Sequence, residues 1–247
     1  MTERISSRAN PAVRQLRQLF ASRRAREETG LFAADGTKLL AEAARYARLD
    51  TVLLSPEVEF CAPPGVRVLR VTPEIMEYVS PSVAPQGAVF TCKIPENPPF
   101  LPQKGMLLLD GLQDPGNVGT ILRTADALDV PVALLEGCAD PYNHKTVRAS
   151  MGAVFRAAVP RLSWEEAREA LRAAAIPVAV TAMAASAVDL RERELGGCAV
   201  VVGSEGQGVR PEILAAAQEM LTIPMNPHCE SLNAAVAAAI VMWQMKK

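Results

Sequence analysis

The sequence is poor in aromatic residues and histidine, and it lacks the spacings that mark common metal sites. Aromatic residues make up 4% of the 247 positions, and there are two histidines, His144 and His228. Neither histidine has a neighbouring pattern for nucleophilic or metal chemistry, so neither is expected to be catalytic. The five cysteines show no CxxC or mixed Cys/His spacing, which favours reduced thiols and no bound metal.

Long apolar runs are also missing. The most apolar segment, residues 234–242, is too short to span a bilayer, and the N-terminus is polar and rich in arginine, unlike a signal peptide. We therefore expect a soluble protein of the cytoplasm with no membrane partner. The chain contains neither GxGxxG nor GxxxxGK(S/T), which argues against an alternative function as a nucleotide-dependent oxidoreductase.

A proline-rich segment divides the chain into two predicted domains. Residues 94–104 contain four prolines, which cannot donate to a helix or a sheet, so this stretch is expected to be an extended linker. It separates an N-terminal domain, residues 1–93, from a larger C-terminal domain, residues 105–247.

The N-terminal domain is predicted to be a small α/β sandwich. Its first helix is expected to begin at the Asn10-Pro11 cap and to end near Gly30. Further helices are expected at residues 37–48 and 73–79. Short apolar runs predict strands at residues 31–34, 51–55, 67–71 and 88–92.

The C-terminal domain alternates apolar strands with amphipathic helices. Strands are expected at residues 106–110, 132–135, 178–181, 199–202 and 221–224, and helices at residues 118–128, 164–175, 211–217 and 231–245. Near-continuous apolar strands of this kind are typical of a mostly parallel sheet with helices on both faces. The predicted fold class is therefore α/β.

Basic residues are concentrated near the N-terminus. Residues 1–48 contain ten Lys or Arg and five acidic residues, a net charge of +5, although the whole chain carries −1. Such an arm can neutralise the phosphates of a polyanion; an ordinary solvated helix face is the alternative. Four arginines are expected to lie largely away from the apolar face of the first helix: Arg14, Arg17, Arg24 and Arg26. The first three are our candidates for RNA contact.

Three loop segments, residues 110–123, 203–208 and 223–234, each follow a predicted buried strand and lead toward a helix. Ligands of open α/β sheets bind where such loops converge. In the first segment, Asn117 is expected to cap the helix, and Arg123 lies about two turns into it, which suits a phosphate or a ribose. A capped helix whose arginine pairs with a surface acid is the alternative.

The other segments are less specific when each is taken alone. Glycines in residues 203–208 permit the backbone to approach a planar ligand closely, although a plain tight turn is the alternative. Ser231 and Asn233 stand where they could simply cap the last helix. A fourth stretch, residues 143–152, offers Lys145 and Arg148 either as contacts to an RNA backbone or as routine surface charge.

Taken together, these segments resemble the motifs of the SpoU/TrmH group of RNA ribose 2′-O-methyltransferases in the SPOUT superfamily. The resemblance covers essentially the whole chain. It implies S-adenosylmethionine as the cofactor, a C-terminal trefoil knot and a homodimer that uses the last helix. Residues 30–36 and 80–87 are similar to landmarks of the substrate-binding domain of these enzymes, although relatives usually place Glu where Asp35 stands.

The resemblance also implies a role for each motif residue. The active centre is assigned to Asn117, Arg123, Glu205, Ser231 and Asn233. The cofactor site is assigned to Gly203, Glu205, Ile223, Met225, Ser231 and Leu232. Because a guanidinium stays protonated, we favour positioning and electrostatic stabilisation of the reacting ribose over general-base chemistry for Arg123.

The predicted function is S-adenosylmethionine-dependent methylation of a ribose 2′-hydroxyl. We prefer rRNA as the substrate because the chain carries a separate N-terminal module, and tRNA is the alternative. A non-catalytic RNA-binding protein with the same fold is a rival hypothesis, which the intact motif residues disfavour.

Overall fold

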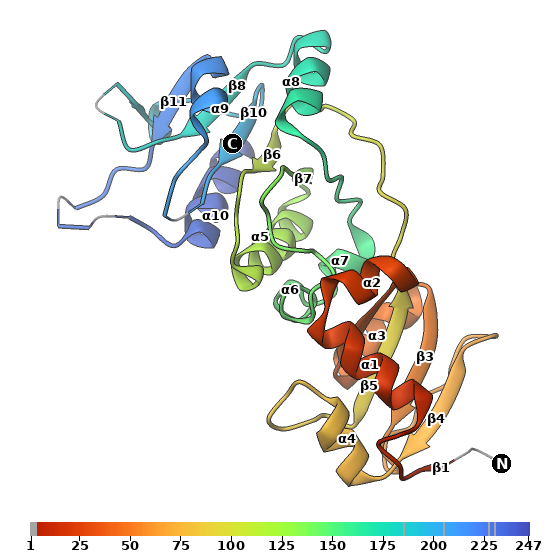
Figure 1. Cartoon of the computed structure of the whole chain (residues 1–247). Coiled ribbons are helices and arrows are strands. Elements are labelled where there is room, and N and C mark those ends of the chain that lie inside the picture. The colour runs from red at the N-terminus through yellow and green to blue at the C-terminus, as the bar shows by residue number, and fades with distance from the viewer. Residues whose placement is uncertain (1–3, 185, 205, 227, 230) are drawn as a thin grey trace. The chain divides into compact units, whose positions relative to one another are not determined.

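The computed structural model describes residues 4–184, 186–204, 206–226, 228–229 and 231–247 (Figure 1). The chain forms two compact units. The first comprises Met1–Glu96 together with Asp140–Arg156, and the second comprises Asn97–Ala139 together with Ala157–Lys247. The segment Asp140–Arg156, which was expected within the C-terminal domain, therefore packs with the N-terminal part of the chain.

The first unit is built on a sheet of five strands in the order β1-β4-β3-β5-β2. These strands are β1 (Arg4–Ile5), β4 (Arg67–Val71), β3 (Leu49–Leu54), β5 (Ala88–Lys93) and β2 (Leu31–Asp35). Strand β4 runs parallel to β1 and β3, whereas β5 is antiparallel to both β3 and β2. Asp35 thus ends an edge strand of this mixed sheet.

Helices cover both faces of this sheet. The unit contains α1 (Pro11–Ala21), α2 (Arg23–Thr29), α3 (Thr37–Tyr46), α4 (Pro73–Val79), α6 (His144–Ser150) and α7 (Ala153–Arg156). Leu16 of α1 and Ile75 of α4 share one buried cluster with Leu53. Helices α3, α6 and α7 contribute to a second buried cluster, where Val147 of α6 lies with Phe90. Residues 140–156 therefore help to form the core of the first unit.

The single helix expected over residues 11–30 is wrong, because the structure has two helices there. Asn10 caps α1 as predicted, accepting a hydrogen bond from the amide of Ala12 at 2.9 Å. Ser22 then adopts an extended conformation, and its hydroxyl accepts a hydrogen bond from the amide of Ala25 at 3.2 Å. A serine in this geometry is a strong N-cap, so it starts a second helix.

The second unit contains a sheet of six strands in the order β7-β6-β10-β8-β11-β9, and every neighbouring pair is parallel. The strands are β6 (Met106–Leu109), β7 (Val132–Leu134), β8 (Val178–Thr181), β9 (Val188–Asp189), β10 (Ala199–Val202) and β11 (Glu219–Thr222). This confirms the prediction of a parallel α/β sheet.

Alternate residues of the central strands belong to two different buried clusters, each formed with its own set of helices. One set contains α5 (Pro115–Leu128), η1 (Leu190–Glu192) and α10 (Ala234–Met245), and the other contains α8 (Trp164–Ala173) and α9 (Pro211–Ala216). Along β6, Leu107 and Leu109 join the cluster of α5 and α10, whereas Met106 and Leu108 join that of α8 and α9. The near-continuous apolar sequence of β6 follows from burial on both faces.

Residues 94–103 of the proline-rich stretch form neither helix nor strand. Its Asn97 side chain exchanges two hydrogen bonds of 2.9 Å with the backbone of Arg161, so this part is attached to the second unit. The trefoil knot stays a prediction. None of the helices in the described part of the chain combines the length and apolarity that a bilayer crossing needs.

Candidate functional site

The three motif loops meet at one edge of the parallel sheet. Strands β6, β10 and β11 precede them, and β10 lies between β6 and β8, which in turn pairs with β11. Because all these strands are parallel, the loops that follow their carboxyl ends lie at the same edge, where ligands of such sheets bind. The topology therefore brings segments together that lie about a hundred residues apart in the sequence.

A cavity of about 460 Å³ lies at this edge. Five of the residues predicted to hold the cofactor line it: Gly203, Ile223, Met225, Ser231 and Leu232. Glu205, predicted for both the cofactor site and the active centre, lies outside the described residues. The volume falls within the range of roughly 300–1,000 Å³ that is usual for small-molecule sites.

The loop after β8 also lines the cavity, and the sequence analysis missed it. Thr181, the last residue of β8, lines the cavity together with Met183 and Ala184 of the loop, and Met183 is 68% exposed. A usable signal was present, because residues 178–181 were predicted as a strand of the same parallel sheet. The end of that strand must lie at the edge where the motif loops meet.

Backbone pairing closes the loop that contains Gly203 and Gly208. Ser204 and Gly208 exchange two backbone hydrogen bonds of 3.1 and 2.9 Å. A Cβ atom at position 203 would overlap the backbone of Gly208 and Val209. The glycine at 203 is therefore required by a close approach of two backbone segments, which is consistent with the tight turn that the sequence left open as an alternative.

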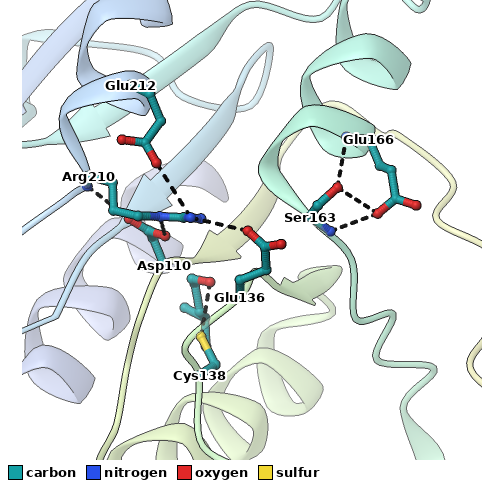
Figure 2. Close-up of polar contacts among 8 residues, drawn as sticks. Asp110, Glu136, Cys138, Ser163, Glu166, Arg210 and Glu212 are labelled. Carbon is teal, nitrogen blue, oxygen red and sulfur yellow. Dashed lines mark hydrogen bonds and ion pairs between the residues drawn. The ribbon is translucent and has the colours of Figure 1, made fainter.

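A buried carboxylate stands beside this loop (Figure 2). Asp110 is 1% exposed and binds Arg210 twice, accepting from its Nε at 2.7 Å and from its backbone amide at 2.9 Å. Burial lowers the pKa of Arg210, but the hydrogen bond and charge of Asp110, with the nearby Glu136 and Glu212, outweigh that effect and raise the pKa overall. The guanidinium is thus fixed in its charged form.

Asn117 does not cap α5, contrary to the prediction. The cap is Asp114, whose Oδ1 accepts a hydrogen bond from the amide of Asn117 at 2.8 Å. Pro115 then occupies the first helical position, where its missing N–H has no cost. Asn117 therefore lies in the first turn, and its side chain is available for contacts outside the helix.

Asn233 joins the first turn of α5 to the start of α10. Its Oδ1 caps α10 by accepting hydrogen bonds from the amides of Ala235 and Val236 at 2.9 and 3.3 Å. Its Nδ2 donates to Oδ1 of Asn117 at 3.0 Å. The side chain of Asn233 therefore both caps α10 and contacts the first motif. Ser231 lies before the cap and lines the cavity.

A groove of about 780 Å³ runs along α5 and α10 in the same unit. Asn117, Arg123 and Asn233 line it together with apolar residues of α10. Arg123 is exposed and makes no ion pair or side-chain hydrogen bond among the residues that the structure describes. The surface-acid pairing considered for this arginine is thus not found within that part of the chain.

The basic residues predicted to contact RNA all lie in the first unit, and their surroundings differ. Arg14 and Lys145 are exposed. Arg17 lies over the ring of Tyr78, 4.8 Å from its centroid, and donates to its carbonyl oxygen at 3.0 Å. Arg24 pairs with Glu28 at 2.6 Å.

Two further arginines are held by carboxylates. Arg148 binds the buried Asp35 through Nη2 at 2.8 and 2.6 Å. Arg26 was expected to lie away from the apolar face, and this is wrong. Its side chain is 4% exposed and pairs with Asp140 at 2.7 Å. Its spacing in the helix gave no signal of that partner, which lies 114 residues away.

The described residues contain no group of three or more His, Cys, Asp or Glu placed to hold a metal ion. The roles of the individual motif residues stay predictions, but five of them share one cavity and three share the neighbouring groove. The first turn of α10 contributes to both, through Ala234 to the cavity and Ala235 to the groove.

Comparisons with known proteins identify the family of the chain. Residues 104–243 match the SpoU rRNA Methylase family, and residues 10–89 match the MRM3-like substrate binding domain. The 23S rRNA (guanosine(2553)-2′-O)-methyltransferase RlmP of Bacillus subtilis (strain 168) is 30% identical over 248 residues, covering 99% of this chain and 99% of that protein.

Two solved structures are similar over nearly the whole chain. The AdoMet-bound rRNA methyltransferase from Sinorhizobium meliloti is 31% identical with a TM-score of 0.89, covering 99% of this chain and 97% of that one. The SpoU methyltransferase AviRb from Streptomyces viridochromogenes, in complex with AdoMet, is 25% identical with a TM-score of 0.84, covering 96% and 98%. The chain therefore belongs to the SpoU rRNA methylase family.

Proposed function

We propose that this protein transfers a methyl group from S-adenosylmethionine to a ribose 2′-hydroxyl of rRNA. The observation that carries the proposal is the convergence of three motif loops on one cavity and one adjoining groove of the parallel sheet. Family membership and the AdoMet-bound structures of similar proteins support the same chemistry.

The cavity fits S-adenosylmethionine in size and in the groups that line it. Gly203 permits a close backbone approach, and Thr181, Ser204 and Ser231 offer hydroxyl groups among apolar neighbours. A small number of polar groups in an apolar setting is typical of sites for ligands of this size. When bound, S-adenosylmethionine supplies the electrophilic methyl group.

The groove residues are suited to orienting a ribose and its phosphate. Asn233 is fixed by its capping bonds and in turn fixes Asn117, so both amides are preorganised. Arg123 presents a guanidinium that remains charged and can bind a phosphate through two parallel hydrogen bonds. We assign positioning to these residues, because correct orientation alone can supply about 7–11 kcal/mol of a reaction barrier.

The preference for rRNA rests on the relatives and on the first unit. The similar protein RlmP is named as a 23S rRNA methyltransferase, and residues 10–89 match a substrate-binding domain. Exposed Arg14 and Lys145 give this unit cationic groups that can contact an RNA backbone. A tRNA substrate is the alternative outcome of the experiment below.

The proposal includes a homodimer formed through α10. Three large apolar side chains of this helix are exposed, with Val236 at 48%, Ile240 at 36% and Trp243 at 65%. Together they line the groove beside α5. An apolar face of this kind marks an interaction surface, and a second copy seated there would adjoin Asn117 and Arg123.

Methyl transfer to purified RNA tests the proposal. Unmodified rRNA and tRNA are each incubated with the protein and S-adenosylmethionine labelled in its methyl group, using wild type, Arg123→Lys and Arg123→Ala. We expect transfer to rRNA and a loss of about 10²–10³ in rate for Arg123→Ala, as for removal of one preorganised donor. Arg123→Lys keeps the charge but lacks the bidentate fork, so an intermediate rate is expected.

Two outcomes would contradict the proposal. Binding of S-adenosylmethionine without methyl transfer to either RNA would contradict the assigned activity. A rate of transfer that is unchanged in Arg123→Ala would show that the groove is not part of the reacting site. Transfer to tRNA alone would retain the chemistry and replace the substrate class.

A further inference from the structure

Asp110 contacts both ends of the loop that runs from Gly203 to Gly208. At the end of β10, its backbone amide donates to the carbonyl of Val202 at 2.9 Å. On the far side of the loop, its carboxylate accepts a hydrogen bond from the amide of Arg210 at 2.9 Å. Asp110, a residue of the first motif, therefore binds the chain on both sides of the second motif, at Val202 just before it and at Arg210 two residues after it. We call this pair of contacts the bracket.

The guanidinium of Arg210 strengthens this bracket (Figure 2). Its Nε donates to Asp110 Oδ1 at 2.7 Å, so each carboxylate oxygen is bound by a different group of the same residue. Charge-assisted hydrogen bonds of this kind are roughly twice as strong as neutral ones. The carboxylate is 1% exposed, and a buried charge of this kind is stable only when it is paired.

The remaining contacts of Arg210 differ in kind. Glu136 and Glu212 lie 3.2 and 3.5 Å from Nη1, and their side chains are 59% and 55% exposed. Exposed pairs contribute little because solvent screens them. Within the described chain, the contact between Arg210 and Asp110 is thus the one that bears on the loop.

We propose that Asp110 is a positioning residue for the methyl donor, which acts by holding Gly203, Ser204 and Gly208 in the positions where they line the cavity. Neither Asp110 nor Arg210 lines the cavity, whereas Gly203, Ser204 and Gly208 do. Asp110 therefore acts through the loop and not by contact. This inference rests on the proposed function only in identifying the ligand as S-adenosylmethionine.

The chemistry of the contact explains why a carboxylate is needed. The amide and Nε of Arg210 donate to different oxygens of Asp110, and asparagine at position 110 would keep an acceptor at only one of these two positions. Its amide NH₂ would face a second donor at one of these positions. Arg210 would then lose one of its two hydrogen bonds to residue 110, either the backbone bond beyond the loop or the guanidinium bond that strengthens it.

The experiment compares Asp110→Asn and Arg210→Lys with two control variants, Glu136→Gln and Glu212→Gln, in the full-length chain. We measure the Kd of S-adenosylmethionine by calorimetry, the KM values for donor and RNA, and the hydrogen exchange of amides 203–209. We expect Asp110→Asn to weaken donor binding about 10- to 100-fold, about 1.4–2.8 kcal/mol. Exchange should increase in the loop, and the KM for RNA should stay unchanged within about twofold.

The controls remove a charge beside the same guanidinium without touching the bracket, so we expect changes of about twofold or less. Arg210→Lys keeps the backbone bond to Asp110 and should weaken donor binding less than Asp110→Asn. It also gives an independent test if Asp110→Asn does not fold.

The outcomes separate this inference from the proposed function. Wild-type donor affinity and loop exchange in both Asp110→Asn and Arg210→Lys would overturn the positioning role and leave the methyltransferase proposal intact. An equal increase in the KM values for donor and RNA would indicate that Asp110 has a general structural role, and this would also overturn the inference. A wild-type protein that does not bind S-adenosylmethionine would overturn both the proposed function and the ligand assigned to the loop.

Discussion

Asp140→Ala is expected to destabilise the first compact unit strongly, because it leaves a buried guanidinium without its partner. Arg26 and Asp140 have side chains that are 4% and 9% exposed. Arg26 donates to Asp140 from Nε at 2.8 Å and forms an ion-pair contact of 2.7 Å through Nη2. Asp140 also accepts a hydrogen bond from the amide of Tyr142 at 2.9 Å, so its loss affects the start of the segment Asp140–Arg156 as well.

The expected magnitude follows from burial. Removing one partner of a buried ion pair typically costs about 3–5 kcal/mol, since the remaining charge is desolvated and uncompensated. A matched control lies in the same helix, α2, where Glu28 pairs with Arg24 at 2.6 Å but both side chains are at least 60% exposed. Glu28→Ala should therefore cost only about 0.3–0.5 kcal/mol, as for other exposed helix pairs.

Urea unfolding at pH 7 measures both variants, and the transition of the first unit is the relevant one because two units need not unfold together. The combined replacement Arg26→Met with Asp140→Leu removes both charges and should recover most of the stability lost in Asp140→Ala. An unfolding free energy for Asp140→Ala within about 1 kcal/mol of wild type, on the scale of an exposed pair, would refute the reasoning. The segment Asp140–Arg156 would then be held mainly by its apolar contacts.

Two further predictions concern pH dependence and assembly. Burial lowers the pKa of His144 below its ordinary 6.5, and Arg148 and Lys145 add to this against the opposing charge of Asp35. As the pH falls, the unfolded chain therefore takes up this proton before the folded chain does. The free energy of unfolding should fall as the pH drops below about 6.5, and it should fall less in His144→Gln. Parallel pH profiles of the two proteins would contradict this. Trp243→Glu should convert the proposed dimer to a monomer in light scattering, whereas Trp243→Phe should not. A wild-type protein that is a monomer would contradict the proposed interface.

Much of the cavity wall was predictable from the sequence. Gly203 and Ile223 lie directly after apolar strands, and parallel strands deliver their following loops to one edge of the sheet. The order of the strands then brings these positions together without any need to know side-chain contacts. For the same reason, the contribution of Thr181 was predictable in principle, although no motif drew attention to it.

Local capping chemistry was harder to assign. Asp114 and Asn117 are both good cap residues, and the structure uses Asp114 because Pro115 occupies the first helical position. Ser22 interrupts the expected long helix by the same chemistry, since its hydroxyl caps the next turn. In both places several side chains had suitable chemistry, and the choice depends on backbone conformation.

Contacts between distant segments left no pattern in the sequence. Arg26 looked like a surface residue of a basic arm, and only the packing of residues 140–156 against the first unit shows that it is buried. The pairing of Asp110 with Arg210 is likewise separated by a hundred residues. Periodicity reports which face of an element is apolar, but it does not report which charged group another segment brings to it.

The position of the transferred methyl group tests the central claim most directly. rRNA methylated by the protein with labelled S-adenosylmethionine is hydrolysed in alkali, and the products are separated by length. A methyl group on the ribose blocks the 2′-hydroxyl from cleaving the adjacent phosphodiester, so we predict label in alkali-resistant dinucleotides. Label in single nucleotides would place the methyl group on a base and contradict the account.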